Sequence, residues 1–419
     1  MRSLSASSAA NNAGTPHYLG LAALLRMNFT GVNLAPVCQR MIQRAAADPG
    51  DAGSLMDAAV IFQFRGQEEL VPQLQSEALR IRRHFVIPAA KAPRLRLLVL
   101  MAPGNLMANV PIECLLEESD VELNLYYVSD KPDTRGLPEH DLLFVAIGES
   151  EANRPILEAW APLLAAWPHP LLNNPRNIPR VARDTASRLL HALPGVAMPP
   201  TVRLPRALLE AVAAQAGTLP AGIAFPLIVR PVDSHAGHDL YKIETPIELA
   251  QTLAQVPAAE FFVSCFVDYR NADGQFRKYR VILIEGRPHL CHMAISSHWM
   301  IHYLNAGMAE SPAKRAEEAR VMEEFNTGFA SRHAAALAAI NEAIGLDYLG
   351  IDCAETADGR LLVFEVDPAM VVHAMDPVDL YPYKPAAMQR LFAAFRAMLY
   401  RAAAGSTVAE EHRHGAIAA

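Results

Sequence analysis

The stretch LDYLGIDCAETADGRLLVFEVDPAM, residues 346–370, contains two apolar runs separated by an Asp-Gly pair at 358–359. Asp-Gly is typical of a two-residue type I′ hairpin turn, because both central residues of that turn need a positive φ. A hairpin with this turn places Asp352 directly opposite Glu365. Asp367 follows two residues later and therefore shares a face with Glu365. The sequence predicts a β-hairpin that brings three carboxylates to one point.

These three carboxylates predict a metal site. Like charges that lie opposite each other on a sheet destabilise it unless a cation lies between them. A set of ligands made only of oxygen atoms suits Mg²⁺ or Mn²⁺. We therefore expect Asp352, Glu365 and Asp367 to hold one of these ions. The alternative is an ordinary hairpin whose acidic side chains face water.

The composition of the whole chain limits the possible classes of protein. A length of 419 residues predicts two or three domains, and 52% hydrophobic with 19% charged residues is typical of a globular protein. The net charge of −7 gives no electrostatic reason to expect a nucleic-acid partner. No apolar run reaches the roughly 18–20 residues of a membrane span, and the first residues do not form a signal peptide. Five scattered cysteines without CxxC spacing indicate reduced thiols and a cytoplasmic protein.

The periodicity of apolar residues divides the chain into successive segments. Apolar runs at 95–103 and 141–148 alternate with helical patterns, which indicates an open α/β domain with a parallel sheet. The loop after the first run contains no GxGxxG, which argues against an NAD enzyme. The predicted segments are a disordered tail (1–18), a helical region resembling one tetratricopeptide-like pair (19–90), the α/β domain (91–200), an α+β domain (201–404) and an unstructured tail (405–419).

Candidate phosphate-binding residues precede the acidic hairpin. The strand PLIVRPV contains Arg230, and Lys278 and Arg280 alternate onto one face of the later strand RKYRVILI. Long cations on one face can neutralise phosphate oxygens, although basic residues also commonly protect a solvated sheet edge. A small loop between strands can cover a polyphosphate with its N–H groups. The loop DSHAGHD supplies Ser234, His235, Gly237 and His238.

In this order, the cationic strand, the small glycine loop, the basic ribbon and the acidic hairpin ending in E-x-D-P resemble the ATP-grasp superfamily. The resemblance covers about residues 95–400 and is closest to glutathione-synthetase-like carboxylate–amine ligases. It implies an open α/β domain followed by an ATP-grasp domain, whose two α+β subdomains clasp ATP. The N-terminal helical region is an addition to this plan.

The resemblance also implies a role for each candidate residue. Arg230, Lys278 and Arg280 would contact the phosphates and stabilise the transferred charge, and Arg183 is the nearest candidate for a further phosphate-binding cation. The segment VSCFVD, residues 263–268, would hold adenine between Phe266 and Val267. The small loop would act as a lid, and the three carboxylates would bind magnesium. Asp367 stands where the family more commonly has Asn, Arg230 replaces the usual Lys, and the lid has one glycine where two or three are common.

The implied activity is an ATP- and Mg²⁺-dependent ligase that forms an amide through an acylphosphate. Its carboxylate and amine substrates would bind near Trp299, His302 and Tyr303. Two alternatives stay open: a kinase that phosphorylates a hydroxyl, and a non-catalytic nucleotide-binding protein whose N-terminal helices hold a protein partner. The sequence leaves the identity of the substrates and a homodimeric state open.

Overall fold

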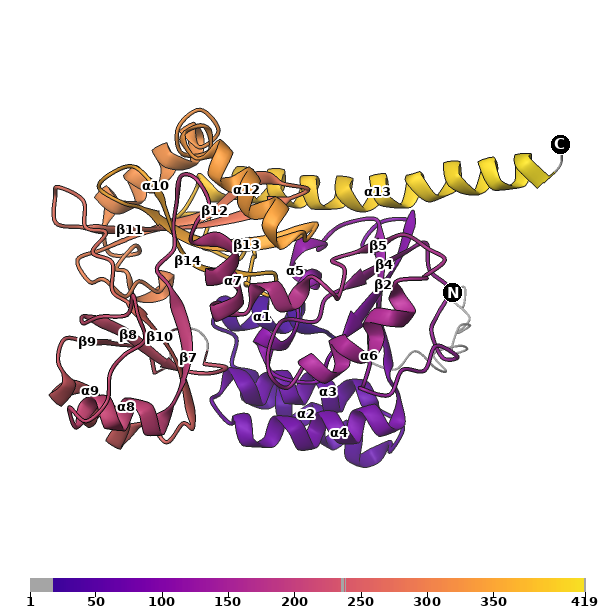
Figure 1. Ribbon diagram of the computed structural model, residues 1–419. Coiled ribbons are helices and arrows are strands. Elements are labelled where there is room, and N and C mark those ends of the chain that lie inside the picture. Colours follow the sequence, from indigo (N-terminus) through magenta and orange to yellow (C-terminus); the bar gives the residue numbers. More distant parts are fainter. Residues whose placement is uncertain (1–17, 235–236, 238, 418–419) are drawn as a thin grey trace, which may run out of the picture.

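The computed structural model describes residues 18–234, 237 and 239–417, with side chains up to residue 405. The chain forms three β-sheets with helices packed on them (Figure 1). An open α/β domain comes first along the chain after the helical region, and two α+β units follow it. This arrangement confirms the fold class expected from the sequence.

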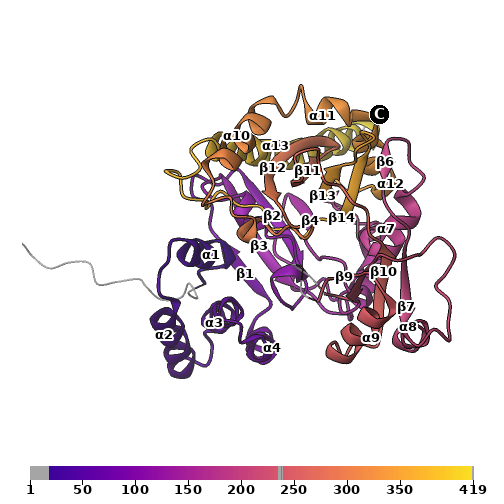
Figure 2. The same ribbon diagram turned by 90° about the vertical axis from the view of Figure 1, so that its left-hand side faces the viewer.

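The N-terminal region is a layer of helices beside the first sheet (Figure 2). Its main elements are α1 (Leu21–Phe29), α2 (Leu34–Ala47), α3 (Ala52–Phe64) and α4 (Val71–Ile81), with the short 3₁₀ turn η1 (Glu68–Leu70) before α4. β1 (His84–Ile87) follows within the range predicted to be helical. It is a strand because its β-branched and aromatic residues pair antiparallel with the edge of the sheet.

The first sheet has the strand order β1-β3-β2-β4-β5. Its parallel strands are β2 (Leu95–Met101), β3 (Val121–Tyr127), β4 (Leu142–Val145) and β5 (Leu171–Leu172). The connections carry η2 (Leu106–Ala108), α5 (Ile112–Leu115) and α6 (Arg154–Leu164). β2 and β4 are buried along almost their whole length, as their continuous apolar runs predict for a parallel sheet.

The second sheet is antiparallel and has helices on one face. Its order is β7-β10-β8-β9, formed by β7 (Thr201–Pro205), β10 (Glu260–Cys265), β8 (Leu227–Pro231) and β9 (Tyr241–Ile243). The helices α8 (Arg206–Ala213) and α9 (Pro246–Gln255) bury Leu209 and Leu249 against Val229 and Phe261. This unit has its own small core, separate from that of the third sheet.

The third sheet contains the acidic hairpin. Its order is β12-β11-β13-β14-β6, formed by β12 (Arg287–Ser296), β11 (Phe276–Ile284), β13 (Tyr348–Glu355), β14 (Leu361–Asp367) and β6 (Val196–Ala197). The helical elements of this part are η3 (Ile178–Val181), α7 (Arg183–Leu190), η4 (Tyr303–Asn305), α10 (Pro312–Glu324), α11 (Phe329–Arg332) and α12 (Ala334–Ile344).

The hairpin has the predicted pairing but a different turn. Asp352 lies opposite Glu365, as expected. The turn, however, has three residues, since the Thr356 N–H donates to the Arg360 carbonyl and only Gly359, at φ 80°, adopts the left-handed region. A bulge between Asp352 and Cys353 on the pairing ladder offsets this extra residue. The prediction of a two-residue turn is wrong, and the prediction of the carboxylate pairing is confirmed.

The last helix is longer than the sequence suggested. α13 runs from Lys384 to Ile417, through the tail predicted to be unstructured, and its C-terminal part projects beyond the rest of the molecule (Figure 1). Ala, Glu and Arg are strong helix formers, and a single glycine at position 405 lowers helix stability by only about 1 kcal/mol. Among the described residues, no helix is both long and apolar enough to cross a membrane.

Candidate functional site

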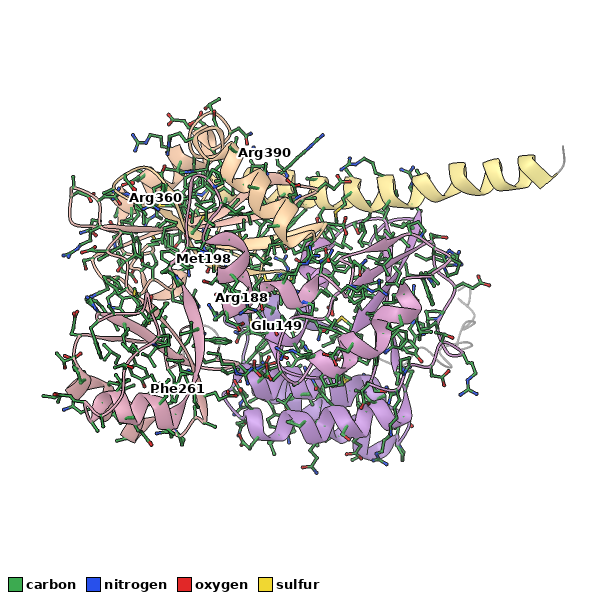
Figure 3. All side chains as sticks on the ribbon, viewed as in Figure 1. Glu149, Arg188, Met198, Phe261, Arg360 and Arg390 are labelled. Carbon is green, nitrogen blue, oxygen red and sulfur yellow. The ribbon has the colours of Figure 1, made fainter. Side chains whose placement is uncertain are left out.

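A cavity of about 730 Å³ brings together most of the predicted site residues. Met198, labelled in Figure 3, lies between β6 of the third sheet and β7 of the second. It is part of the lining of this cavity. The predicted residues that line it are Arg183, Arg230, Gly237, Phe266, Val267, Lys278, Arg280, Asp352, Glu365 and Asp367. Ser234 is not part of the lining but contacts Arg230, and His235 and His238 lie outside the described residues.

Asp352 is held by two cations from the neighbouring strand. Arg280 lies opposite it in the register of β11 and β13, and Lys278 is two residues earlier on the same face. Lys278 Nζ is 2.7 Å from Oδ2, and Arg280 Nε and Nη2 lie 2.8 and 3.0 Å from the two carboxylate oxygens. Burial alone would raise the pKa of Asp352, but Arg280 and Lys278 outweigh it and hold the pKa far below its usual value. Asp352 is therefore ionised at neutral pH and shares its charge with two cations.

Glu365 and Asp367 have different environments on the same strand. Arg183, the first residue of α7, places Nη2 2.5 Å from Glu365 Oε1. The charges of Arg183 and Arg230 lower the pKa of Glu365 despite its burial. Asp367 is only 8% exposed and accepts a hydrogen bond from the Ala369 N–H. Burial, followed by the charge of Glu365, raises the pKa of Asp367 to about 7.

The three carboxylates share one cavity but do not form one coordination site. Within the described part of the chain, no three His, Cys, Asp or Glu side chains are arranged to hold a metal ion. Their oxygen donors suit Mg²⁺, yet Asp352 and Glu365 are engaged by cations. For these residues to bind a metal, Lys278, Arg280 and Arg183 would have to turn away. The predicted metal set stays a prediction.

The cations outnumber the fully ionised carboxylates in this part of the cavity. Arg230 is 7% exposed, and burial, followed by the charge of Arg183, lowers its pKa to about 9, so it remains charged at neutral pH. Its Nε donates to Ser234 Oγ at 3.0 Å, and Nη2 donates to the Ser234 carbonyl. Together with Arg183, Lys278 and Arg280 it gives four cations around three carboxylates, one of which titrates near pH 7. The resulting positive charge suits a polyphosphate anion.

An apolar slot lies beside these cations. Phe266 follows β10, and its N–H donates to the Pro226 carbonyl at 2.8 Å. The Phe266 and Trp299 rings meet edge-on, with their centroids 5.7 Å apart. Lys242 Nζ lies 4.1 Å from the centroid of the Phe266 ring. Val267, the next residue, also lines the cavity. A slot walled by aromatic and aliphatic groups next to cations is suited to a flat heterocycle that carries phosphates.

The cavity lining also includes Trp299, His302 and Tyr303, which the sequence placed near the substrates, and it includes further residues that the sequence did not predict. Lys384, 4% exposed at the start of α13, places Nζ 2.5 Å from the Tyr303 hydroxyl and 3.1 Å from Asp376. The ring of His292 of β12 lies 4.6 Å from that of Tyr303, and His373 of the loop after β14 also lines the cavity. No short motif connects these positions, since they come from separate strands, loops and helices.

The fold and the cavity define an α/β protein whose cavity is lined by residues of both α+β units. A scan against protein-family models and a search of curated proteins give no match. D-alanine–D-alanine ligase from Bacillus anthracis, solved with ATP, has 14% identity and a TM-score of 0.43 over 74% of this chain and 96% of that one. VanG D-Ala:D-Ser ligase from Enterococcus faecalis has 14% identity and a TM-score of 0.45 over 73% and 99%. A RimK domain ATP-grasp protein from Sphaerobacter thermophilus has 15% identity and a TM-score of 0.40 over 73% and 99%. These values assign no residue a role.

Proposed function

We propose that this protein is an ATP-dependent carboxylate–amine ligase of the ATP-grasp type. The observation that carries the proposal is the convergence of Arg183, Arg230, Lys278 and Arg280 on one cavity, beside an apolar slot. These cations come from α7, β8 and β11, which are far apart in sequence. A nucleoside triphosphate needs both parts, because it carries several negative charges at one end and a flat apolar base at the other.

The salt bridges of the site define what nucleotide binding must change. Lys278 and Arg280 neutralise Asp352, and Arg183 neutralises Glu365. Phosphate oxygens that enter the cavity compete with these carboxylates for the same cations. Once the cations turn to the phosphates, Asp352 and Glu365 are released as oxygen donors. Nucleotide and metal are then bound together, each favouring the other.

Magnesium is the ion whose chemistry suits the released donors. Asp352, Glu365 and Asp367 would hold it, and when bound it neutralises charge on the phosphate oxygens during transfer. Arg280 and Lys278 supply the same kind of stabilisation from the protein, with fixed positive groups directed at the phosphates. Arg230, buried and held by Ser234, is a third such group.

The reaction requires positioning rather than a protein nucleophile. A carboxylate oxygen of the substrate attacks the γ-phosphorus, the bond to the β-phosphate oxygen breaks, and ADP leaves with that electron pair. The amine then attacks the acyl carbon of the acylphosphate and loses a proton, and phosphate leaves as the C–O bond breaks. The products are an amide, ADP and phosphate. The protein holds the reactants in line and excludes water from the acylphosphate.

Thermal unfolding with ADP, with and without Mg²⁺, tests the nucleotide site. A ligand at 100 times its dissociation constant adds about 2.7 kcal/mol of stability, which raises the melting temperature by several degrees. We expect a rise with ADP and Mg²⁺ that is lost in Glu365→Gln and kept in Glu355→Gln, whose side chain pairs with Arg332 away from the cavity. The absence of any shift with nucleotides would refute the proposal.

Product analysis tests the reaction. We expect pools of carboxylates and amines to stimulate release of free phosphate, and the release to require both pools. A stable phosphoester formed from a hydroxyl compound would instead identify a kinase. Nucleotide binding without turnover in any pool would favour the non-catalytic alternative.

A further inference from the structure

The first helix forms one wall of the cavity. Four cations, Arg183, Arg230, Lys278 and Arg280, mark what we call the phosphate end of the cavity, after the function proposed for them. Leu25 and Phe29 of α1 are also among the lining residues, although they lie more than 150 positions before Arg183. The Phe29 ring lies 4.5 Å from the ring of His373, on the loop that follows the acidic strand β14. The N-terminal helices are therefore more than an outer layer, because α1 reaches the site itself.

α1 is fixed to the body of the molecule by buried carboxylates. Asp57 of α3 accepts hydrogen bonds from the Leu19 and Gly20 N–H groups at 2.8 and 3.1 Å. Glu113 of α5 accepts from the Ala22 N–H at 3.1 Å. These acceptors satisfy N–H groups at and before the N-terminus of α1, where helical N–H groups have no partner within the helix. The opposite end of α1, with Phe29, is thereby held against the cavity.

The apolar side of α1 packs on the same loop. Leu25 is buried in a small cluster with Cys114 and Met375, and Phe29 and Val371 pack against that cluster. Val371 and Met370 also line the cavity. This end of the cavity thus has an apolar wall formed by α1 and by the loop after β14.

Hydrogen-bond donors lie next to this apolar wall. The Met375 N–H donates to His373 Nδ1 at 3.1 Å, so the ring hydrogen of neutral His373 is on Nε2. Nε2 has no hydrogen-bond partner among the described residues, while the ring lines the cavity. Arg280 extends between the two ends, since it binds Asp352 and also donates from Nη1 to the Val371 carbonyl at 3.2 Å.

We infer that the carboxylate substrate carries an apolar group, which packs on Leu25 and Phe29. Its carboxylate lies toward His373 Nε2 and Arg280, facing the phosphate end of the cavity. The position of the carboxylate rests on the proposed ligase function, whereas the apolar wall does not. α1 is then a specificity element that this chain adds to the site.

Calorimetric titration of the full chain with 3-phenylpropionate and with acetate, in the presence of Mg²⁺ and a non-hydrolysable ATP analogue, tests this inference. We expect 3-phenylpropionate to bind the unchanged protein at least about tenfold more tightly than acetate, because the two acids differ by a benzyl group. Phe29→Ala should remove that difference and leave acetate binding unchanged. His373→Ala should weaken both acids by a similar factor.

Phe64→Ala is the matched control. Phe64 of α3 packs against the same small cluster but does not line the cavity, so its loss should change stability without changing either affinity. If Phe29→Ala does not fold, Phe29→Trp provides a second test, since the larger ring should narrow the wall and weaken 3-phenylpropionate alone. Equal affinities of the two acids for the unchanged protein, or no effect of Phe29 variants, would overturn the inference.

The two proposals fail in distinguishable ways. ADP binding, measured in a separate titration, reports the phosphate end and should be unaffected by Phe29→Ala. A protein that does not bind ADP but still prefers 3-phenylpropionate through Phe29 would refute the ligase and retain the apolar site. A protein that binds ADP but does not prefer 3-phenylpropionate to acetate would retain the ligase proposal and refute the apolar site.

Discussion

The two ends of the cavity are built in opposite ways. At the phosphate end, cations and carboxylates bind one another, as in the pairing of Lys278 and Arg280 with Asp352. At the α1 end, Phe29 presents an apolar ring and His373 a neutral ring, whose pKa is lowered chiefly by burial. The first end must exchange its own ion pairs for those of a ligand, whereas the second offers a surface that needs little rearrangement. Under the two proposals, the phosphate end gains from a ligand that brings both a metal ion and phosphates, and the α1 end selects the substrate by shape.

Among the tests of this comparison, we expect the largest effect from the removal of the Asp352 carboxylate. Asp352→Ala leaves Lys278 and Arg280 partly buried without their counter-charge. Breaking a buried ion pair by removing one partner destabilises by about 3–5 kcal/mol, and we expect the lower part of that range because both cations keep some access to water. Urea unfolding measures the loss. Asp358→Asn, in the exposed turn of the same hairpin, should change the free energy of unfolding by less than about 0.5 kcal/mol. An equal effect of the two substitutions would contradict the account.

Arg280 connects the two ends, so its removal should lower turnover. Under the proposed function, Arg280→Gln removes a positive group that binds the phosphates, together with the contacts to Asp352 and the Val371 carbonyl. Loss of one such transition-state contact lowers kcat by about 10²–10³-fold. The rate of phosphate release with saturating ATP and substrates measures this change. Arg332→Gln, which removes a cation that binds Glu355 outside the cavity, should leave kcat unchanged.

The pH dependence of stability should separate the α1 anchor from the acidic hairpin. Burial raises the pKa of Asp57 and of Glu113 to about 7, while the pKa of Asp352 is held far below its usual value. A carboxyl group with a raised folded-state pKa binds more protons in the folded than in the unfolded chain. Its contribution to stability is complete below about pH 4 and is lost as the pH rises to about 7.

Glu113→Gln provides the corresponding measurement. The variant should flatten the fall in unfolding free energy between about pH 4 and pH 7, by an amount on the order of 3 kcal/mol. The nearby Tyr18 and Tyr127 hydroxyls, whose pKa values are raised by burial, stay neutral throughout this window. Urea unfolding at intervals of pH measures the slope, with Glu117→Gln as the control, because Glu117, in the turn after α5, pairs at the surface with Arg26 of α1. A slope unchanged by Glu113→Gln would exclude this group as its source.

The phosphate end was more accessible to sequence reasoning than the α1 end, for a physical reason. Strand alternation and hairpin pairing are local, so the sequence predicted that Asp352 would lie opposite Glu365. The predicted turn was one residue too short. The predicted pairing of Asp352 with Glu365 is nevertheless confirmed, because a bulge near Phe364 offsets the longer turn. Chain-local rules could not predict that β11 pairs with β13, and therefore the ion pairs of Lys278 and Arg280 with Asp352 were not foreseen.

The contact between Phe29 and His373 joins segments more than 340 residues apart, and no motif marks either position. The extension of α13 to Ile417 was missed for a different reason. Whether a helix continues past a glycine depends on free-energy differences of about 1 kcal/mol, and a sequence pattern does not resolve differences this small.

A smaller expected effect tests whether Asp352 competes with a polyphosphate for Lys278 and Arg280. If Asp352 holds cations that a polyphosphate needs, Asp352→Asn should raise the affinity for pyrophosphate in the absence of Mg²⁺, by about tenfold. The same variant should lose the gain in pyrophosphate affinity that Mg²⁺ gives to the unchanged protein, because one oxygen donor is neutralised. Calorimetric titration with and without Mg²⁺ measures both changes.

Asn is close in size to Asp and keeps one acceptor for Arg280, so this variant separates charge from packing better than Ala does. A fall in the affinity for pyrophosphate without Mg²⁺ would mean that Asp352 positions Lys278 and Arg280 for phosphate rather than competing for them. In that case neither end of the cavity would need to rearrange when its ligand binds, and the two ends would not differ in this respect.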